Sequence, residues 1–251
     1  MKSPLTRCVA TGNALGGTAL GVATLGIAVL GLAVLGLGCR SARDLKLDHW
    51  TGLYTGAPGQ LEQNFKGFQQ DTVPTTWRAE GDAITLVGSG GGDLVTREDF
   101  EDFELTLEWK IAPRGNSGIM FHVSEDPQYS ETYFTGPEMQ VLDNALFDGD
   151  VDMLHAAGAN YALHAPPADY SLPVGEWNRA RIRVEDGRVQ QWLNGQLCCD
   201  YVLGSEDWKK RVTASKFGAM PGYGVQGHGK IVLQDHGDQV WYRNIAVSRL
   251  D

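Results

Sequence analysis

Basic residues are scarce in this chain, and the shortage excludes one broad class of partner. The 251 residues include 21 lysines and arginines against 31 aspartates and glutamates, a net charge of −10 at pH 7. Removing Lys2 and Arg7, the charged residues before Cys39, leaves 19 basic and 31 acidic groups, a net of −12. Nucleic-acid binding depends on Lys and Arg that neutralise phosphates, so nucleic acid is excluded and a small neutral ligand is compatible.

The sequence also lacks the short motifs of several large enzyme classes. Residues 88–92 form a glycine-rich loop without the lysine of a phosphate-binding loop. Gly-Asn-Ser-Gly at 115–118 differs from the Gly-x-Ser-x-Gly nucleophile elbow, and His-Glu-x-x-His is absent. The four cysteines include no Cys-x-x-Cys pair or metal-type spacing. A nucleotide enzyme, a serine hydrolase and a zinc protease are therefore disfavoured.

The N-terminus has the composition of an export signal. Residues 14–38 contain no charged residue and follow a short basic region, and the run ends at Cys39. Twenty-five uncharged residues are enough to cross a bilayer as a helix. The end resembles a bacterial lipobox, although Gly36 stands where leucine is usual. A lipidated Cys39, an uncleaved anchor and a cleaved signal remain open. Each predicts an exported protein in the periplasm or at the outer membrane, touching the membrane only through residues 1–39.

The rest of the chain has the pattern of an all-β protein. Apolar and polar residues alternate over 103–111, 119–123 and 180–184 with period two, and 240–247 is a further strand-like run. Asp-Gly at 186–187 and Asn-Gly at 194–195 separate such runs and predict tight hairpins. No convincing amphipathic helix is found. We expect a sandwich of antiparallel sheets over residues 77–251, with 40–76 as a linker and atypical segment. Of the adjacent Cys198 and Cys199, one is expected in the core and one on the surface.

Several strands place polar side chains opposite their apolar face. The apolar residues of 118–123 leave His122 on the other side, those of 138–141 leave Glu138 and Gln140, and those of 231–236 leave Gln234 and His236. On neighbouring strands, these groups and Lys110 would line one sheet face able to bind a polyol such as a sugar. A simple solvated face is the alternative. Asp143 and Asp235 could equally be turn-forming residues.

Motifs in a regular order run from about Trp77 to the C-terminus. They include Gly-Asp-Leu-Val-Thr at 92–96, Gly-Asn-Ser-Gly-Ile at 115–119, Gly-Pro-Glu-Met-Gln-Val-Leu-Asp-Asn at 136–144, Trp-Leu-Asn-Gly at 192–195, Ser-Lys-Phe at 215–217 and Leu-Gln-Asp-His-Gly at 233–237. In these motifs the chain resembles the 3-keto-disaccharide hydrolase family. Residues 49–74 stand where that family has a Leu-Phe-Asn-Gly phrase ending in Gly-Trp.

The resemblance implies a concanavalin-like jelly roll of two antiparallel sheets and cleavage of glycosides oxidised at C3. A C3 ketone acidifies the hydrogen on C2, so a base can form an enolate that expels the C1 oxygen before water adds. Such a site needs a base, an acid for the leaving group, and a metal ion or cationic donor on the ketone oxygen. We expect the catalytic groups to be Glu138, His122, His236, Asp143 and Lys216. We expect Gln140, Gln234, Asn116, Lys110 and Asp235 to bind substrate, and His122, Glu138 and Asp143 to lie near any divalent metal ion.

Two other functions fit the same residues. A lectin-like module without catalysis would use the same fold and polyol-binding face. A hydrolase of unoxidised polysaccharide would need two acids at a set separation across the scissile bond. Glu138 and Asp143 are five residues apart on one strand and are therefore expected on opposite faces.

Overall fold

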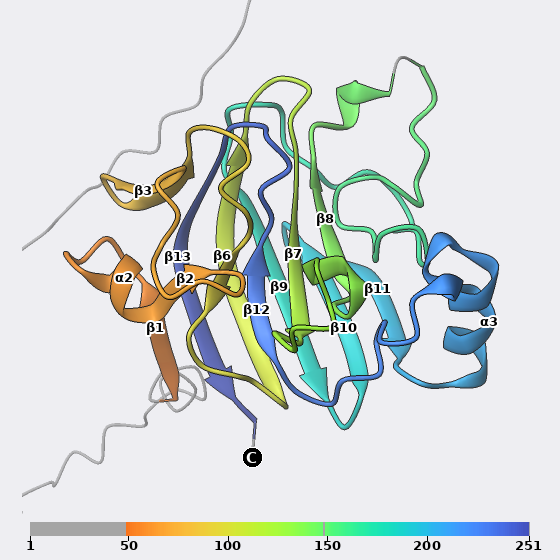
Figure 1. Ribbon diagram of the computed structural model, residues 1–251. Helices are drawn as coiled ribbons and strands as arrows, with labels where there is room; N and C mark the ends of the chain where they lie inside the picture. The colour runs from red at the N-terminus through yellow and green to blue at the C-terminus, as the bar shows by residue number, and fades with distance from the viewer. Residues whose placement is uncertain (1–48, 148, 251) are drawn as a thin grey trace, which may run out of the picture. The chain divides into compact units, whose positions relative to one another are not determined.

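The computed structural model describes residues 49–147 and 149–250. In this part of the chain two antiparallel β-sheets pack against each other around one main hydrophobic core (Figure 1). The fold is all-β, a concanavalin-like jelly-roll sandwich, which confirms the predicted fold class. The expected export segment and Cys39 lie outside the described residues. Among the described residues, no helix has the length and apolar character needed to cross a membrane.

The larger sheet has eight strands in the described part of the chain. Its order is β11-β10-β9-β6-β13-β4-β3, and β1 pairs with β13 beside this path. The strands are β1 (Trp50–Tyr54), β3 (Trp77–Glu80), β4 (Ala83–Leu86), β6 (Phe103–Ile111), β9 (Asn178–Glu185), β10 (Arg188–Leu193), β11 (Gln196–Val202) and β13 (Val240–Arg249).

Within the described residues the smaller sheet has five strands, and its order is β2-β5-β12-β7-β8. They are β2 (Phe65–Gly67), β5 (Leu94–Thr96), β7 (Asn116–Val123), β8 (Glu138–Leu142) and β12 (Lys230–Leu233). The three runs with polar residues opposite their apolar face are therefore neighbours, as the site hypothesis requires. Figure 1 shows β12, β7 and β8 side by side in front of the larger sheet.

Period-two alternation decides which residues enter the core. Every second residue of β6, from Phe103 to Ile111, is buried, and the residues between are partly exposed. In the smaller sheet Ile119, Met139 and Leu233 belong to the same core cluster. Because neighbours on a strand point to opposite faces, Gly118, Glu138, Gln140 and Gln234 lie on the outer face of that sheet.

Two tight turns join β9, β10 and β11 into the predicted meander. Asp186 and Gly187 have φ of 49° and 75°, and Asn194 and Gly195 have 51° and 82°. Positive φ at both central residues matches the hairpin turn whose twist fits antiparallel strands, and Asx-Gly adopts it readily.

The sandwich begins earlier than the predicted boundary at residue 77. Within residues 40–76, β1 pairs with β13 and β2 pairs with β5, so this segment contributes to both sheets. A short helix, α2 (Gln60–Asn64), connects the two strands. These strands are five and three residues long, which leaves little alternation to recognise.

One regular helix, α3 (Glu206–Ala214), was not expected from the sequence. Ser205 caps it by accepting a hydrogen bond from the Trp208 backbone N–H at 3.2 Å, and Trp208 is its buried residue. With a single buried side chain the helix has almost no apolar stripe, so periodicity could not reveal it. The described residues also include the 3-10 turns η1 (Thr132–Phe134), η2 (Asn144–Leu146) and η3 (Lys216–Ala219).

In β7 and in β11 an extra residue changes which way side chains point. Met120 and Val123 of β7 pair with β12 residues only two positions apart, so Phe121 and His122 together oppose one residue. His122 has a left-handed φ of 53°. In β11 a register shift leaves Cys198 unpaired, and both Cys198 and Cys199 are 4% exposed. The expectation of one surface cysteine is therefore wrong, because the bulge turns both inward.

Candidate active site

A pocket of about 150 Å³ lies on the outer face of the smaller sheet. Its side chains come from β7, β8, the end of β12 and three loops. Six of the predicted site residues line it, together with two tyrosines that were not predicted. The lining residues are Asn116, Tyr133, Glu138, Gln140, Tyr161, Lys216, Gln234 and His236.

Glu138 is the buried carboxyl group of this pocket. The side chain is at the start of β8 and only 7% of the residue is exposed. A side-chain Cβ at Gly118 would overlap the Glu138 carboxyl, so the glycine on the neighbouring strand makes room for it. Burial raises the pKa of Glu138 to about 8, the Lys216 ammonium opposes that shift, and the Asp93 carboxylate adds to it. Near neutral pH this group can therefore give or take a proton.

The free edge of β8 is covered by residues 158–161. The Gln140 N–H donates to the Ala159 carbonyl at 3.0 Å, and the Gly158 N–H donates to the Gln140 carbonyl at 2.9 Å. The Tyr161 N–H donates to the Glu138 carbonyl at 3.0 Å. This backbone pairing places the Tyr161 ring beside the buried carboxyl group, although the two residues are 23 positions apart in the chain.

Lys216 supplies the positive charge of the pocket. It is the first residue of η3, and Ser215 caps that turn by accepting the Phe217 N–H. The Lys216 ammonium lies 4.3 Å from the centre of the Tyr161 ring. The face of an aromatic ring attracts a cation electrostatically, which helps to hold the ammonium in place. The pocket therefore presents one positive group near one carboxyl group.

The amides of the pocket have unused acceptors. The Gln140 Nε2 group donates to Asn116 Oδ1 at 2.8 Å. The Oε1 atoms of Gln140 and of Gln234 are buried and have no hydrogen-bond partner within the described chain. Buried polar atoms are rarely left unpaired, so each indicates a place for an external donor such as a hydroxyl group. His236 is exposed at the rim.

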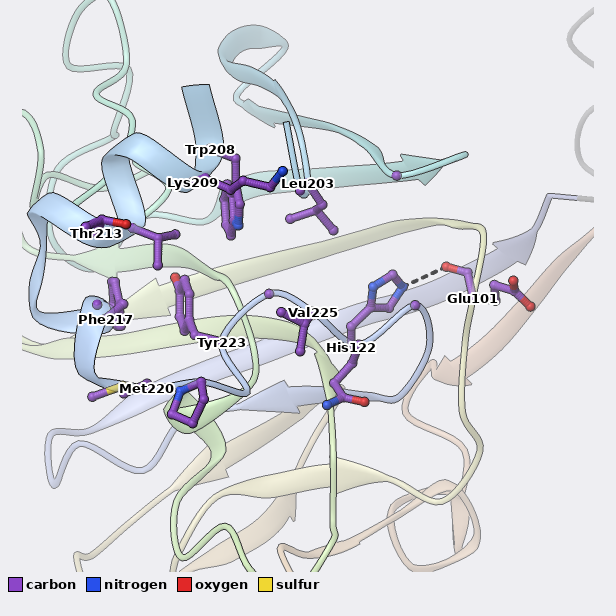
Figure 2. A pocket seen from close by; sticks show the side chains of 18 of the residues that line it. Glu101, His122, Leu203, Trp208, Lys209, Thr213, Phe217, Met220, Tyr223 and Val225 are labelled. Carbon is purple, nitrogen blue, oxygen red and sulfur yellow. Dashed lines mark hydrogen bonds between the residues drawn. The ribbon is translucent and has the colours of Figure 1, made fainter. Parts of the chain in front are cut away.

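His122 lies elsewhere, which corrects its predicted place among the catalytic and metal-binding residues. The bulge in β7 turns its side chain toward Phe103 and Phe121, with ring-centre distances of 6.0 and 5.4 Å. Its Nε2 atom is hydrogen-bonded to the Glu101 carbonyl at 2.8 Å, as Figure 2 shows. Burial lowers the pKa of this imidazole. His122 lines a different cavity, of about 690 Å³, beneath α3.

The two aspartates expected near the site instead stabilise backbone turns. Asp143 accepts hydrogen bonds from the Arg114 N–H at 2.7 Å and the Ala145 N–H at 3.0 Å, and so caps η2. Asp235 accepts from the Gly91 and Gly92 N–H groups, each at 3.2 Å. Neither lines the pocket, so their predicted direct roles in catalysis and substrate binding are corrected here.

Lys110 is on the wrong sheet for substrate binding in this pocket. It belongs to β6 of the larger sheet, and its ammonium lies between the rings of Trp177 and Trp241, at 5.0 and 4.4 Å. The alternation of residues predicts which side of a strand a residue occupies but not which sheet the strand joins.

The predicted metal ligands do not form a set. His122, Glu138 and Asp143 occupy three separate surroundings. Across residues 49–147 and 149–250, no group of three or more His, Cys, Asp or Glu side chains is arranged to hold a metal ion. The residues present therefore do not fit the divalent ion that the sequence analysis considers.

Three residues near Glu138 were missed from the sequence. Tyr133 and Tyr161 lie in the irregular 125–170 stretch, where no periodicity shows direction. Asp93 lies within the recognised Gly-Asp-Leu-Val-Thr motif, and that motif was the available signal. Burial, the largest cause, raises the pKa of Asp93 to about 6.

Known proteins are similar to this chain over most of its length. Residues 49–248 match the model of the 3-keto-alpha-glucoside-1,2-lyase-like domain. A 3-keto-disaccharide hydrolase of Bacteroides thetaiotaomicron is 34% identical over 230 residues, which cover 80% of this chain and 79% of that protein.

Solved structures show the same architecture. A provisionally named glycosyl hydrolase of Parabacteroides distasonis superimposes with a TM-score of 0.74 at 34% identity, over 82% of this chain and 96% of that one. A second such protein of that organism has a TM-score of 0.61 at 22% identity, over 80% and 99%, and shares the fold. These relatives support a carbohydrate-active enzyme of the glycoside hydrolase type. The chain belongs to the 3-keto-alpha-glucoside-1,2-lyase-like family.

Proposed function

We propose that this protein cleaves 3-keto-glycosides, in particular 3-keto-disaccharides, by elimination across C1 and C2 followed by hydration. The observation that carries the proposal is Glu138, a buried carboxyl group with a pKa near 8 that shares a polar pocket with the Lys216 ammonium. The name of the Bacteroides thetaiotaomicron relative, a 3-keto-disaccharide hydrolase, supports the same substrate class.

The first step is removal of the C2 hydrogen. In its ionised form Glu138 takes this proton, and the electron pair of the C2–H bond moves toward the C3 ketone to form an enolate. The Lys216 ammonium stabilises the negative charge that develops on the ketone oxygen. Preorganised charge at such a position is worth about 10²–10³ in rate.

The second step expels the leaving group and adds water. The C3 carbonyl re-forms, the C2=C3 electron pair of the enolate becomes a C1=C2 double bond, and the C1–O bond breaks. We assign His236 as the acid that protonates the departing oxygen. Water then adds at C1, giving a proton back to His236, while protonated Glu138, after its acidic proton has exchanged with the solvent, protonates C2. One water is consumed, one alcohol and one 3-keto-sugar are released, and both side chains regain their starting forms.

The remaining pocket residues suit a neutral sugar. The unpartnered Oε1 atoms of Gln140 and Gln234 can accept hydrogen bonds from sugar hydroxyls, and Asn116 orients Gln140. Tyr133 and Tyr161 add aromatic surface. No step is assigned to a metal ion, because the predicted ligands are not brought together.

Two alternatives fit this geometry less well. Direct hydrolysis of an unoxidised glycoside needs a second acid across the scissile bond, and Asp143 is committed to capping η2. A lectin-like module would bind sugar through amides and aromatic rings alone. It would gain nothing from a buried carboxyl group that stays protonated up to neutral pH.

The decisive experiment compares substrates in deuterated buffer. The protein is incubated with 3-keto-trehalose and with trehalose, with and without a chelator. We expect cleavage of the keto-sugar alone, with deuterium at C2 of the released 3-keto-glucose and no effect of the chelator. Products without deuterium, together with cleavage of trehalose, would contradict the elimination route. Binding without turnover would favour the lectin-like module.

We also propose that the enzyme is exported and attached at the cell envelope through Cys39. The support is the uncharged run at 14–38 and the lipobox-like sequence that ends it. Metabolic labelling with a fatty acid should mark the full-length protein and not the Cys39→Ser variant. Equal labelling of the two proteins would exclude lipidation at this residue.

A further inference from the structure

Asp93 is not itself a lining residue of the pocket, but it joins segments of the chain that surround the pocket. It lies directly before β5, and its Oδ1 atom accepts the Asp235 backbone N–H at 2.7 Å. Its Oδ2 atom accepts the Thr132 hydroxyl group. The Asp235 side chain makes a second link between the same two segments, because its Oδ2 atom accepts hydrogen bonds from the N–H groups of Gly91 and Gly92.

Each segment held by Asp93 carries pocket residues. Thr132 precedes Tyr133, and Asp235 lies between Gln234 and His236; all three neighbours line the pocket. These contacts join parts of the chain 39 and 142 residues apart. Without Asp93, the segments are expected to lose their common anchor beside the pocket.

The Asp93 charge reaches Glu138. Asp93 is one of the groups that raise the pKa of Glu138, whereas Lys216 lowers it. Tyr161, Tyr223 and Tyr242 also interact electrostatically with Glu138, and burial raises the pKa of each. The charged groups that act on Asp93 itself are the like-charged Asp235 and Glu131. Between pH 6 and 8, Asp93 is therefore an anion that opposes ionisation of Glu138.

We propose that Asp93 is a positioning residue of the active site: its carboxylate anchors the segments that carry Tyr133, Gln234 and His236, and its charge acts on the Glu138 carboxyl. The proposal rests on the proposed function for its kinetic consequence. Its electrostatic part can be tested without turnover.

The test uses the folded full-length protein and its Asp93→Asn variant. Asparagine keeps the shape and an oxygen acceptor but removes the charge. With ¹³C-labelled glutamate, the Glu138 signal is identified by its loss in Glu138→Gln and is followed as a function of pH. We expect its pKa to fall in Asp93→Asn, and the limb of the pH–rate profile that reports Glu138 to move to lower pH. Glu80→Gln, on the exposed part of β3, is the matched charge control and should change neither.

A second variant separates the anchoring role from the charge. Thr132→Val removes one hydrogen bond and keeps the Asp93 carboxylate. It should lower the Glu138 pKa less than Asp93→Asn does, while lowering kcat/KM by about 10- to 100-fold through misplacement of Tyr133. An unchanged Glu138 pKa in Asp93→Asn would overturn the electrostatic part. Parental kcat/KM in both variants would overturn the anchoring part.

The two proposals fail in different ways. If Glu138→Gln keeps full activity on the keto-sugar, the proposed mechanism is wrong, yet the NMR titration still measures the coupling between Asp93 and Glu138. If Glu138→Gln is inactive and Asp93→Asn leaves titration and kinetics unchanged, the mechanism stands and the role of Asp93 is rejected.

Discussion

Two cavities share the segment that begins with η3, and their side chains differ in chemistry. Lys216 lines the smaller one, of about 150 Å³, and the next residue, Phe217, lines the larger one, of about 690 Å³. The smaller cavity contains a buried carboxyl group, a cation and two unpartnered amide oxygens. The larger cavity contains a histidine already hydrogen-bonded to the backbone and a wall of aromatic rings (Figure 2).

The aromatic wall of the larger cavity is mostly packed against itself. Tyr223 stacks on Phe217 with ring centres 3.9 Å apart and lies parallel to Trp208 at 5.9 Å, and Trp208 stacks on Tyr201 at 5.4 Å. The ring faces that could receive a sugar are therefore largely covered by other rings. Volume alone would select the larger cavity. The pairing of a buried carboxyl group with the Lys216 ammonium selects the smaller one.

The strongest way to break this comparison is to remove the acid–base group. Glu138→Gln keeps the shape of the side chain, and kcat on a 3-keto-disaccharide should fall about 10²- to 10⁴-fold. His122→Gln, in the larger cavity, should change kcat less than about 3-fold because the imidazole does not line the smaller cavity. Steady-state kinetics of the two variants would settle the assignment. The reverse order of effects would place the chemistry beneath α3.

Charge offers the next largest contrast. Lys216→Met preserves the length of the side chain and removes the ammonium, so kcat should fall about 10²- to 10³-fold as the enolate loses its stabilising charge. Lys209→Met removes a lysine that lines the larger cavity and serves as the matched control. A kcat for Lys216→Met within a factor of two of that control would assign the ketone oxygen to another donor.

Substrate binding should respond less than catalysis. Gln140→Ala removes an acceptor for a sugar hydroxyl and the partner of Asn116, so KM should rise about 5- to 30-fold with a smaller change in kcat. Gln190→Ala on β10, an amide of the larger sheet, is the control and should leave KM unchanged. A loss confined to kcat would show that Gln140 acts in the chemical step.

The smallest expected effect is on thermal stability. Here the Glu138→Gln substitution should be favourable, whereas it lowers activity. The pKa of Glu138 lies near 8 in the folded protein and near 4.5 when unfolded, so the folded state binds the extra proton and stability falls as pH rises between these values. Glu138→Gln escapes this loss. Its Tm should equal that of the parent near pH 4 and exceed it by a few degrees at pH 9, measured by differential scanning calorimetry. A lower Tm at pH 9 would contradict burial of an ionisable carboxyl group.

Strand alternation in the sequence predicted half of the residues that line the smaller cavity. Gln140, Gln234 and Glu138 lie where period two places them, because their strands are regular and are neighbours in one sheet. The same argument failed for His122, because one extra residue in β7 reverses the side on which the following residues lie. A bulge depends on the partner strand, so a single strand's pattern cannot reveal it.

Residues contributed by loops were beyond the reach of the sequence pattern. Tyr161 arrives through backbone pairing of residues 158–161 with β8, and Asp93 acts through a hydroxyl group and an N–H far away in the chain. Neither arrangement has a period, and both depend on contacts between distant segments. The fold class was easier to predict, because the core is the sum of many such alternations and tolerates a few bulges.

Gly118 has a consequence for anyone who evolves this enzyme in the laboratory. Its hydrogen occupies the place next to the Glu138 carboxyl group where any other side chain would collide. A saturation library at position 118 alone should therefore contain almost no active clone. A library that varies positions 118 and 138 together includes alanine at 118 with aspartate at 138. Aspartate is shorter than glutamate by one methylene, so its carboxyl group leaves room for the alanine Cβ. The two positions must therefore be varied together, because screening them one at a time would miss this combination.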